Sequence, residues 1–288
     1  DMYTVDGLRV LVTSDRVSAF DRVLGTIPFK GQVLTQLSNW WFEQLSDVVS
    51  HHVKDMPDPN VIIGHEAQPL PVEVIVRGYI TGSTSTSLWT LYNEGVDRPY
   101  GLDLPAGLTK NTALPEAVIT PTTKAERGEH DERLTSEQVV ELGLVEPKLW
   151  EQVQSVALEI FRRGQEVARK AGLILVDTKY EFGMINGELC LIDEVHTPDS
   201  SRYWVAETYE DAIADGRPPQ QFDKEHLRLW LSAQGYRGEG APPALSHDIV
   251  SEVSARYISA YERLTGLTFV PGEQPPAARI ASRVAAYF

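Results

Sequence analysis

The stretch LILVDTKYEFGMINGELCLIDEV, residues 173–195, carries the densest signal about the fold of this chain. It contains two largely apolar segments, residues 173–182 and 188–195, whose length and composition are typical of β-strands. Ile185-Asn186-Gly187 joins them, and Asn-Gly between such segments is a strong hairpin signal. The sequence therefore predicts an antiparallel pair of strands in which several charged side chains interrupt the apolar pattern.

Charged side chains gather on one face of the first strand. Alternate residues of a strand share a face, which places Asp177, Lys179 and Glu181 together. The alternate face is predicted to point into a core and consists of Val176, Tyr180 and Phe182. The first strand is thus expected to present a row of titratable groups from an otherwise apolar support.

The length of the turn decides whether Asp193 joins this row. A three-residue loop with Gly187 in the left-handed conformation would bring Asp193 onto the face of Glu181, within ~8 Å at the Cβ atoms. A two-residue Asn-Gly loop would put Glu181 and Asp193 on opposite faces. A shared site for these two carboxylates is therefore expected to require the longer turn.

Glu181 and Asp193 are the predicted metal ligands. Oxygen ligands favour Mg²⁺ or Mn²⁺ over Zn²⁺, and Mg²⁺ typically binds one or two carboxylates plus phosphate oxygens. The alternative is the solvated charged face of an ordinary hairpin. We favour the metal because the segment is strongly apolar, and because carboxylates crowded around one lysine repel each other unless a cation joins them.

A second signal is the run VIVRGYITGS, residues 74–83, which hydroxyl residues 84–87 follow. Glycine lets a backbone approach an anion closely, and Arg77 offers a planar fork to phosphate or carboxylate. Ser83 belongs to the same loop, and Arg202 would bring a second guanidinium to the same anion. The alternative is a polar loop with one surface arginine.

Two further polar clusters are less specific. One is a loop directly after a strand, with the candidates Asp15, Ser18 and Asp21. The other places a cation beside a titratable pair, with the candidates Lys124, His130 and Asp131. Taken alone, such clusters are more often structural than catalytic.

Composition bounds the class of protein. The chain has 288 residues, of which 42% are hydrophobic and 23% charged, which excludes disorder, collagen and coiled coil. This length usually divides into two lobes. The formal net charge of −15 disfavours a broad surface for nucleic acid or an anionic membrane.

Cysteine usage and hydropathy bear on the compartment. The single cysteine, Cys190, excludes an intrachain disulfide and fits a reducing environment. No apolar run approaches the ~18–20 residues that span a bilayer, and none resembles a secretory signal. These observations predict a cytoplasmic protein.

The remaining pattern predicts an alternation of strands and helices. Strands are expected at residues 3–5, 8–12, 61–63 and 72–76, and helices at residues 33–45, 147–171, 223–235 and 246–266. Residues 64–71 are predicted to be a polar connector that serves as the hinge between lobes, and residues 84–130 long ordered loops. The tail from Pro271 is placed only loosely.

Read together, five stretches closely resemble the SAICAR synthetase family of purine biosynthesis: residues 14–21, 71–83, 120–131, 177–183 and 193–204. The resemblance implies a mixed α/β fold, two-lobed and ATP-grasp-like, with a small antiparallel-sheet lobe at residues 1–70 that covers nucleotide. Residues 71–288 would form a larger α/β lobe with C-terminal helices that holds the substrates and the metal. The run of residues 81–92 looks like the longer form of the family.

The reaction implied by the resemblance consumes ATP, 5-amino-1-(5-phosphoribosyl)imidazole-4-carboxylate (CAIR) and L-aspartate, and gives ADP, phosphate and the succinocarboxamide. Lys179 would face the transferring phosphoryl group and Asp177 would orient Lys179 or bind the imidazole. Glu181 and Asp193 would hold Mg²⁺. The ribose 5-phosphate would be gripped by Arg77, Ser83 and Arg202. The two less specific clusters would serve aspartate and the closing loops.

The start of the chain departs from the family pattern. Family members open with a glycine-rich turn over the ATP phosphates, and Asp1-Met2-Tyr3 fits only its end. We expect the natural protein to have upstream residues, including a glycine and a lysine, that complete a mobile flap. His65-Glu66-Ala67-Gln68 replaces residues that are usually basic, which affects side chains of the adenine hinge rather than its backbone.

Two other functions remain open from the residues alone. One is another ATP-grasp-like or kinase-like enzyme that phosphorylates a small molecule. The other is a nucleotide-binding regulatory module without catalysis, which the intact Lys179, Glu181 and Asp193 argue against. Monomer and homo-oligomer are equally compatible with the sequence.

Overall fold

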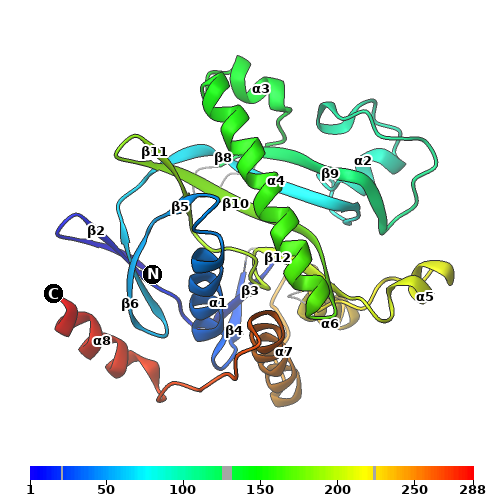
Figure 1. Ribbon diagram of the computed structural model, residues 1–288. Helices are drawn as coiled ribbons and strands as arrows, with labels where there is room; N and C mark the ends of the chain where they lie inside the picture. Colours follow the sequence, from blue (N-terminus) through cyan, green and yellow to red (C-terminus); the bar gives the residue numbers. More distant parts are fainter. Residues whose placement is uncertain (21, 125–131, 223–224) are drawn as a thin grey trace.

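The computed structural model describes residues 1–20, 22–124, 132–222 and 225–288 (Figure 1). Its strands are β1 (Met2–Val5), β2 (Leu8–Val12), β3 (Arg16–Ala19), β4 (Arg22–Thr26), β5 (Ser50–His51), β6 (Val53–Asp58), β7 (Val61–His65), β8 (Gln68–Ile80), β9 (Thr112–Thr123), β10 (Leu173–Ile185), β11 (Glu188–Ile192) and β12 (Ser201–Val205). Its helices are α1 (Lys30–Gln44), α2 (Leu88–Asn93), α3 (Ser136–Glu141), α4 (Pro147–Lys170), α5 (Tyr209–Ala214), α6 (Glu225–Ala233), α7 (His247–Thr265) and α8 (Pro276–Tyr287), with a 3₁₀ turn at Pro99–Gly101.

Two sheets organise the chain, and the mixed α/β class predicted from the sequence is confirmed. The first is antiparallel with the strand order β1-β2-β7-β6, and the second has the order β5-β11-β10-β8-β9. The long strand β10 is central to the second sheet because β12 pairs with its first half and β11 with its second half. A third, two-stranded sheet joins β3 to β4.

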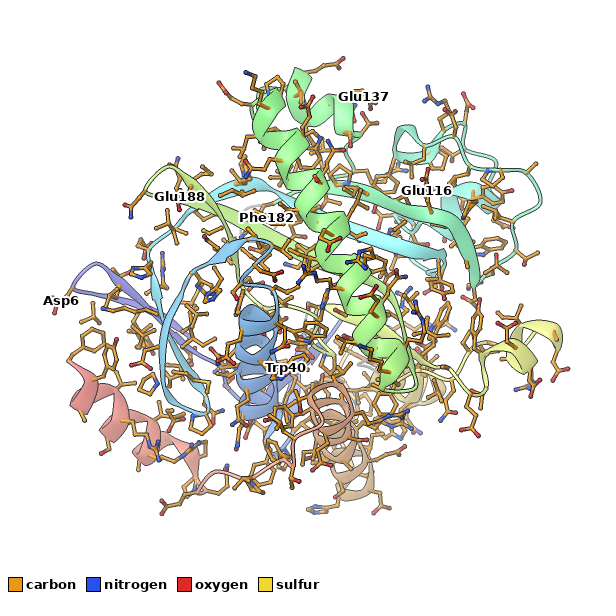
Figure 2. All side chains as sticks on the ribbon, viewed as in Figure 1. Asp6, Trp40, Glu116, Glu137, Phe182 and Glu188 are labelled. Carbon is orange, nitrogen blue, oxygen red and sulfur yellow. The ribbon has the colours of Figure 1, made fainter. Side chains whose placement is uncertain are left out.

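The main core lies between the second sheet and the helices α1 and α4. Trp41 and Phe42 of α1 and Phe161 of α4 are fully or almost fully buried, and they pack in one cluster with Tyr180 and Phe182 of β10. Each such side chain contributes ~1.5–3 kcal/mol through burial. In Figure 2 the labelled Asp6 and Glu188 lie at the ends of their hairpins, whereas Phe182 lies inside the molecule.

Local sequence features account for the bounds of several elements. The hairpin of residues 3–12 is formed by β1 and β2. Thr135 and Gln138 make the reciprocal hydrogen bonds of a capping box at α3. Pro147 occupies the first turn of α4, and Gly172, with a φ of 70°, follows its end. Ser246 caps α7, which Gly266 terminates in the left-handed conformation.

The polar connector predicted at residues 64–71 is wrong. β7 continues to His65 and β8 begins at Gln68, so only two residues separate the strands. Pro69 and Pro71 are tolerated because they lie at the start of β8, near the end of its pairing with β10. Fewer ladder hydrogen bonds depend on their missing N–H groups there. The boundary proposed between residues 70 and 71 falls within β8, and the division into two lobes stays a proposal.

The long loops predicted for residues 84–130 are wrong in large part. α2, the 3₁₀ turn and the whole of β9 lie in this segment. Pro115 and Pro121 interrupt the sequence pattern of β9, which forms because residues 112–113 and 118–123 pair with β8. Pro115 lies in the register shift between these two paired stretches, whereas Pro121 pairs with Val74. Long-range pairing of this kind overrides local propensity.

The tail that the sequence placed loosely forms α8, which lies beside β6 (Figure 1). Its side chains Ile280, Val284 and Tyr287 pack against Val10, Val61 and Ile63 of the first sheet. The last helix of the chain therefore rests on its first sheet. Among the described residues, no helix combines the length and the apolar character needed to cross a membrane.

Candidate active site

The hairpin of β10 and β11 has the short turn. Ile185 pairs with Glu188, so Asn186 and Gly187 alone form the loop, with φ values of 53° and 84°. Both φ values lie in the left-handed region that a type I′ turn requires. The Asn-Gly pair favours this two-residue turn over a three-residue loop. The expectation that a shared carboxylate site needs the longer turn is wrong.

Asp193 nevertheless reaches the charged face of β10. The strand β11 ends at Ile192, and Asp193 has a φ of 65°, which turns the chain out of the strand alternation. The Asp193 carboxylate lies 3.7 Å from the Lys179 Nζ atom. A left-handed residue directly after the strand thus does what the longer turn was expected to do.

Lys179 is the centre of an ion-pair cluster. Its Nζ atom donates to the Glu73 carboxylate at 3.1 Å and also contacts Glu181. Lys124 donates to the other oxygen of Glu181. Three carboxylates and two lysines therefore meet where β8, β9 and β10 lie side by side and β11 ends.

The charges of this cluster are unequally stabilised. Burial acts to lower the pKa of Lys179, but the carboxylates of Glu181, Asp193 and Glu73 outweigh it and raise that pKa. Burial acts to raise the pKa of Glu181, but the two lysines lower it overall. The pKa of Asp193 is raised to about 6, because desolvation and the Glu181 carboxylate disfavour its charge. Of the groups in this cluster, Asp193 is therefore the one whose charged form is least stabilised.

This arrangement fits Mg²⁺. Glu181 and Asp193 lie close enough for one carboxylate to raise the pKa of the other, and a divalent cation relieves such repulsion. The described residues, which leave out 21, 125–131 and 223–224, contain no cluster of three or more His, Cys, Asp or Glu side chains that could hold a metal ion. Two carboxylates suffice where phosphate oxygens and water complete the shell.

Asp177 holds two arginines. Its Oδ2 atom accepts hydrogen bonds from Arg77 at 3.1 Å and from Arg202 at 3.2 Å. These residues are direct cross-strand neighbours, since Asp177 pairs with Arg77 on β8 and with Arg202 on β12. Arg77 also donates from Nε to the Thr120 hydroxyl at 2.9 Å. Both guanidiniums are therefore fixed in place.

The prediction that Val176, Tyr180 and Phe182 share one inner face of the strand is wrong for Val176, because the strand pairing shifts beside Asp177. The pairing of β10 with β12 is irregular between Leu175 and Asp177. Val176 consequently packs in a separate cluster with Trp204 and Tyr209, apart from the cluster that contains Tyr180 and Phe182. An irregularity of this type changes the alternation of side chains along a strand.

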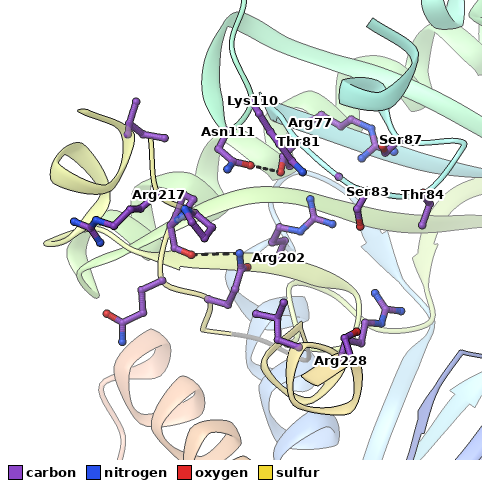
Figure 3. A pocket seen from close by; sticks show the side chains of 18 of the residues that line it. Arg77, Thr81, Ser83, Thr84, Ser87, Lys110, Asn111, Arg202, Arg217 and Arg228 are labelled. Atoms are coloured by element: carbon purple, nitrogen blue, oxygen red, sulfur yellow. Dashed lines mark hydrogen bonds between the residues drawn. The ribbon is translucent and has the colours of Figure 1, made fainter. Parts of the chain in front are cut away.

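The two arginines border a large cationic cavity of about 1330 Å³ (Figure 3). Ser83 and the neighbouring loop residues Thr81, Gly82 and Thr84 line one side of it. Its basic lining residues are Arg77, Lys110, Arg202, Arg217, Arg228 and Arg256. No carboxylate belongs to the described lining, although the chain carries a net charge of −15. The cavity is therefore suited to anions.

A smaller cavity of about 200 Å³ adjoins it and shares the arginines. Asp177 and Lys179 line this cavity together with Asp199 and Ser200. The cationic cavity and the Lys179 cluster thus meet at Arg77 and Arg202.

Sequence reasoning did not find the anchors of Asp199. Its Oδ2 atom accepts a hydrogen bond from Lys30 of α1 at 2.7 Å, and its Oδ1 atom accepts one from the Tyr257 hydroxyl of α7. Lys30 is only 4% exposed. These partners lie far from Asp199 along the chain, so no local pattern connects them. Glu73 was missed for the same reason.

The remaining candidates have mixed positions. Asp15 accepts a hydrogen bond from the Gly31 amide at 2.9 Å, which ties its loop to the start of α1. Ser18 is exposed on β3. Lys124 pairs with Glu181, a partner that the sequence did not predict. Three predicted residues lie outside the described ones: Asp21, His130 and Asp131.

Comparisons with known proteins match nearly the whole chain. The model of a family described as SAICAR synthetase matches residues 1–243. A putative phosphoribosylaminoimidazole-succinocarboxamide synthase 2 of Agrobacterium fabrum is 49% identical over 286 residues, covering 98% of this chain and 90% of the relative. A phosphoribosylaminoimidazole-succinocarboxamide synthase of Legionella pneumophila strain Paris is 45% identical, covering 96% and 88%. The structure of a SAICAR synthase from Saccharomyces cerevisiae complexed with SAICAR has a TM-score of 0.81 and 35% identity, covering 93% of each chain.

Proposed function

The chain belongs to the SAICAR synthetase family, and from that premise we propose which of its side chains carry each part of the reaction. The reaction joins CAIR to L-aspartate and converts ATP to ADP and phosphate, so the protein is an ATP-dependent carbon–nitrogen ligase of purine biosynthesis. A free carboxylate is a poor acyl donor to an amine. Transfer of the γ-phosphoryl group to the CAIR carboxylate creates an acyl phosphate that the aspartate amine attacks.

Lys179 binds the transferring phosphoryl group or the carboxylate that receives it. The Lys179 ammonium is held as a cation by three carboxylates and lines the small cavity. Phosphoryl transfer depends mainly on positioning and on neutralising negative charge, which an oriented ammonium provides. Glu73 and Glu181 fix the direction of the Lys179 side chain.

Glu181 and Asp193 are the side chains that would hold Mg²⁺. When bound there, the ion supplies positive charge to the phosphate oxygens of ATP. The raised pKa of Asp193 supports this assignment, because a second positive charge beside the pair restores the ionised form that a ligand needs.

Arg77, Ser83 and Arg202 grip the ribose 5-phosphate of CAIR. The observation that carries the whole proposal is the cationic cavity. Arg77, Ser83 and Arg202 line it, and the smaller cavity next to it is lined by Lys179. Asp177 holds both guanidiniums, and it is proposed to orient Lys179 or to bind the imidazole as well. The phosphate and the carboxylate of one substrate are thereby directed to opposite ends of a continuous space.

The set proposed for L-aspartate and the closing loops consists of Lys124, His130, Asp131, Asp15, Ser18 and Asp21. Lys124 has the strongest support, because its pairing with Glu181 puts a cation at the edge of the reacting centre. The assignment of the others follows from the family resemblance alone.

Residues 1–70 are proposed to cover the nucleotide. The two sheets meet where His52 donates its amide to the Leu191 carbonyl at 3.2 Å and His65 donates to the His52 carbonyl at 2.8 Å. The first sheet therefore borders the end of β11, two residues from Asp193. The cytoplasm remains the proposed compartment, although the name of a relative from Arabidopsis thaliana includes the word chloroplastic.

A coupled assay for ADP release, with each substrate omitted in turn, tests the function. A ligase with this sequence of steps releases ADP at full rate only when ATP, CAIR and L-aspartate are all present. Full turnover without aspartate would instead indicate a kinase-like phosphotransferase. Binding of ATP without any turnover would indicate a regulatory module.

A further inference from the structure

The helix α8 lies outside the part of the chain that the family model matches, which ends at residue 243. We propose that Arg279 of α8 is a positioning residue for ATP binding, which fixes the first sheet against α1 and thereby sets its place over the nucleotide. This inference rests on the proposed function, in which that sheet covers ATP.

Apolar contact alone attaches α8 only loosely. Ile280, Val284 and Tyr287 touch the first sheet, yet each of these three residues remains partly exposed. A helix that covers a sheet with partly exposed side chains gains only a fraction of the burial energy of a core helix. Its placement therefore depends on more specific contacts.

The specific contact is an ion pair in the interior. Arg279 Nη1 lies 3.1 Å from the Asp58 Oδ2 atom, with the two side chains 8% and 0% exposed. Loss of one partner from such a pair leaves an uncompensated buried charge. Arg283 approaches the same carboxylate at 3.6 Å but is 54% exposed, so it contributes far less.

From Arg279 the contacts continue to the loop that precedes β3. Arg279 Nη2 donates to the Asn60 Oδ1 atom at 2.8 Å, and Asn60 Nδ2 donates to the Thr13 carbonyl at 3.0 Å. Gly31 at the start of α1 packs on this pair, and a Cβ atom there would lie 2.8 Å from Asn60 Nδ2. Gly31 in turn donates to Asp15. One arginine thus connects α8 to the junction of β2, β7 and α1.

The segment before α8 is anchored on α1 as well. Gln32 is 1% exposed and makes two hydrogen bonds to this segment. Its Nε2 atom donates to the Val270 carbonyl at 2.8 Å, and its Oε1 atom accepts from the Gly272 amide at 2.8 Å. Residues 270–288 therefore form a strap with one end on α1 and the other on the first sheet.

The strap does not touch the proposed phosphate site. Arg77 and Arg202 belong to the second sheet and are held by Asp177, independently of α8. Release of the strap is therefore expected to weaken ATP binding and to spare CAIR binding. A purely structural role would weaken both together.

The test compares Arg279→Met with Arg162→Met, which removes from an ion pair on α4 an arginine whose side chain is 54% exposed. For Arg279→Met we expect KM for ATP to rise about tenfold, with KM for CAIR changed less than about twofold, since misplacement of a binding element by about 1 Å lowers efficiency strongly. Arg279→Lys should recover part of the loss, and the control should behave as the wild type.

Hydrogen–deuterium exchange supplies a readout that does not depend on catalysis. The amides of β2 should exchange faster in Arg279→Met than in the wild type, whereas those of β12 should not. Unchanged exchange in β2, or an equal rise of both KM values, would overturn the proposal. If the wild type lacked ligase activity, the proposed function would be wrong. The exchange comparison would still show whether Arg279 fixes the first sheet. If Arg279→Met does not fold, Arg279→Lys provides the same comparison.

Discussion

Arg77→Ala is expected to separate the binding of CAIR from the binding of L-aspartate. The Arg77 guanidinium is held by the Thr120 hydroxyl at 2.9 Å and by Asp177 at 3.1 Å, so its fork is oriented before substrate arrives. A charge-assisted contact of this kind contributes ~1.5–3 kcal/mol, which corresponds to roughly 10- to 150-fold in affinity. KM for CAIR should rise by that factor, with KM for aspartate nearly unchanged.

The same contacts predict the behaviour of related variants. Arg77→Lys should recover only part of the affinity, because a point charge cannot hold Thr120, Asp177 and the phosphate at once. Folding should survive in both variants, since Asp177 keeps Arg202 as a partner and its buried charge stays compensated. Arg202→Ala should resemble Arg77→Ala.

Steady-state kinetics with each substrate varied at saturating levels of the other two, together with thermal unfolding of each variant, would measure these effects. Arg162→Ala serves as the matched control on an exposed ion pair of α4. An equal rise of KM for CAIR and aspartate would show that Arg77 shapes the loop in general and would refute its assignment to the phosphate.

Three further predictions concern the charged cluster and the core. Asp193→Asn and Glu181→Gln should each lower kcat by about two orders of magnitude or more while the protein stays folded, and near-normal turnover at saturating Mg²⁺ would contradict the metal assignment. The folded-state pKa of Asp193, about 6, exceeds the ordinary pKa of an aspartate, 3.8, so its ionisation opposes folding progressively as pH rises between those values. Thermal unfolding of Asp193→Asn should therefore show a gain at pH 7.5 that is absent at pH 4, of about 1 kcal/mol or less because half of the side chain remains in water. Gly164→Ala should lower the unfolding free energy by about 1–3 kcal/mol in chemical denaturation, since its Cβ atom would meet the His196 ring and lie 2.7 Å from Leu175.

Local patterns in the sequence determined the elements whose signals are complete within a few residues. The Asn186-Gly187 turn, the capping box of Thr135 and Gln138, and the termination of α4 near Gly172 depend on backbone conformations that those residue types favour by themselves. The family to which the chain belongs was also evident from the sequence, because the order of motifs along the chain carries that information. Arg77 and Lys179 were singled out as candidates from the same motifs, and their roles stay proposals.

Tertiary structure alone decided how the site is assembled. Asp193 joins Lys179 because one residue adopts a left-handed φ after β11, and strand alternation does not predict such a departure. β9 forms despite two prolines because β8 pairs with it. The bonds from Lys30 to Asp199 and from Arg279 to Asp58 join residues far apart in the chain. The free energy of such contacts exists only once the chain has closed the loops between them, so no local pattern records it.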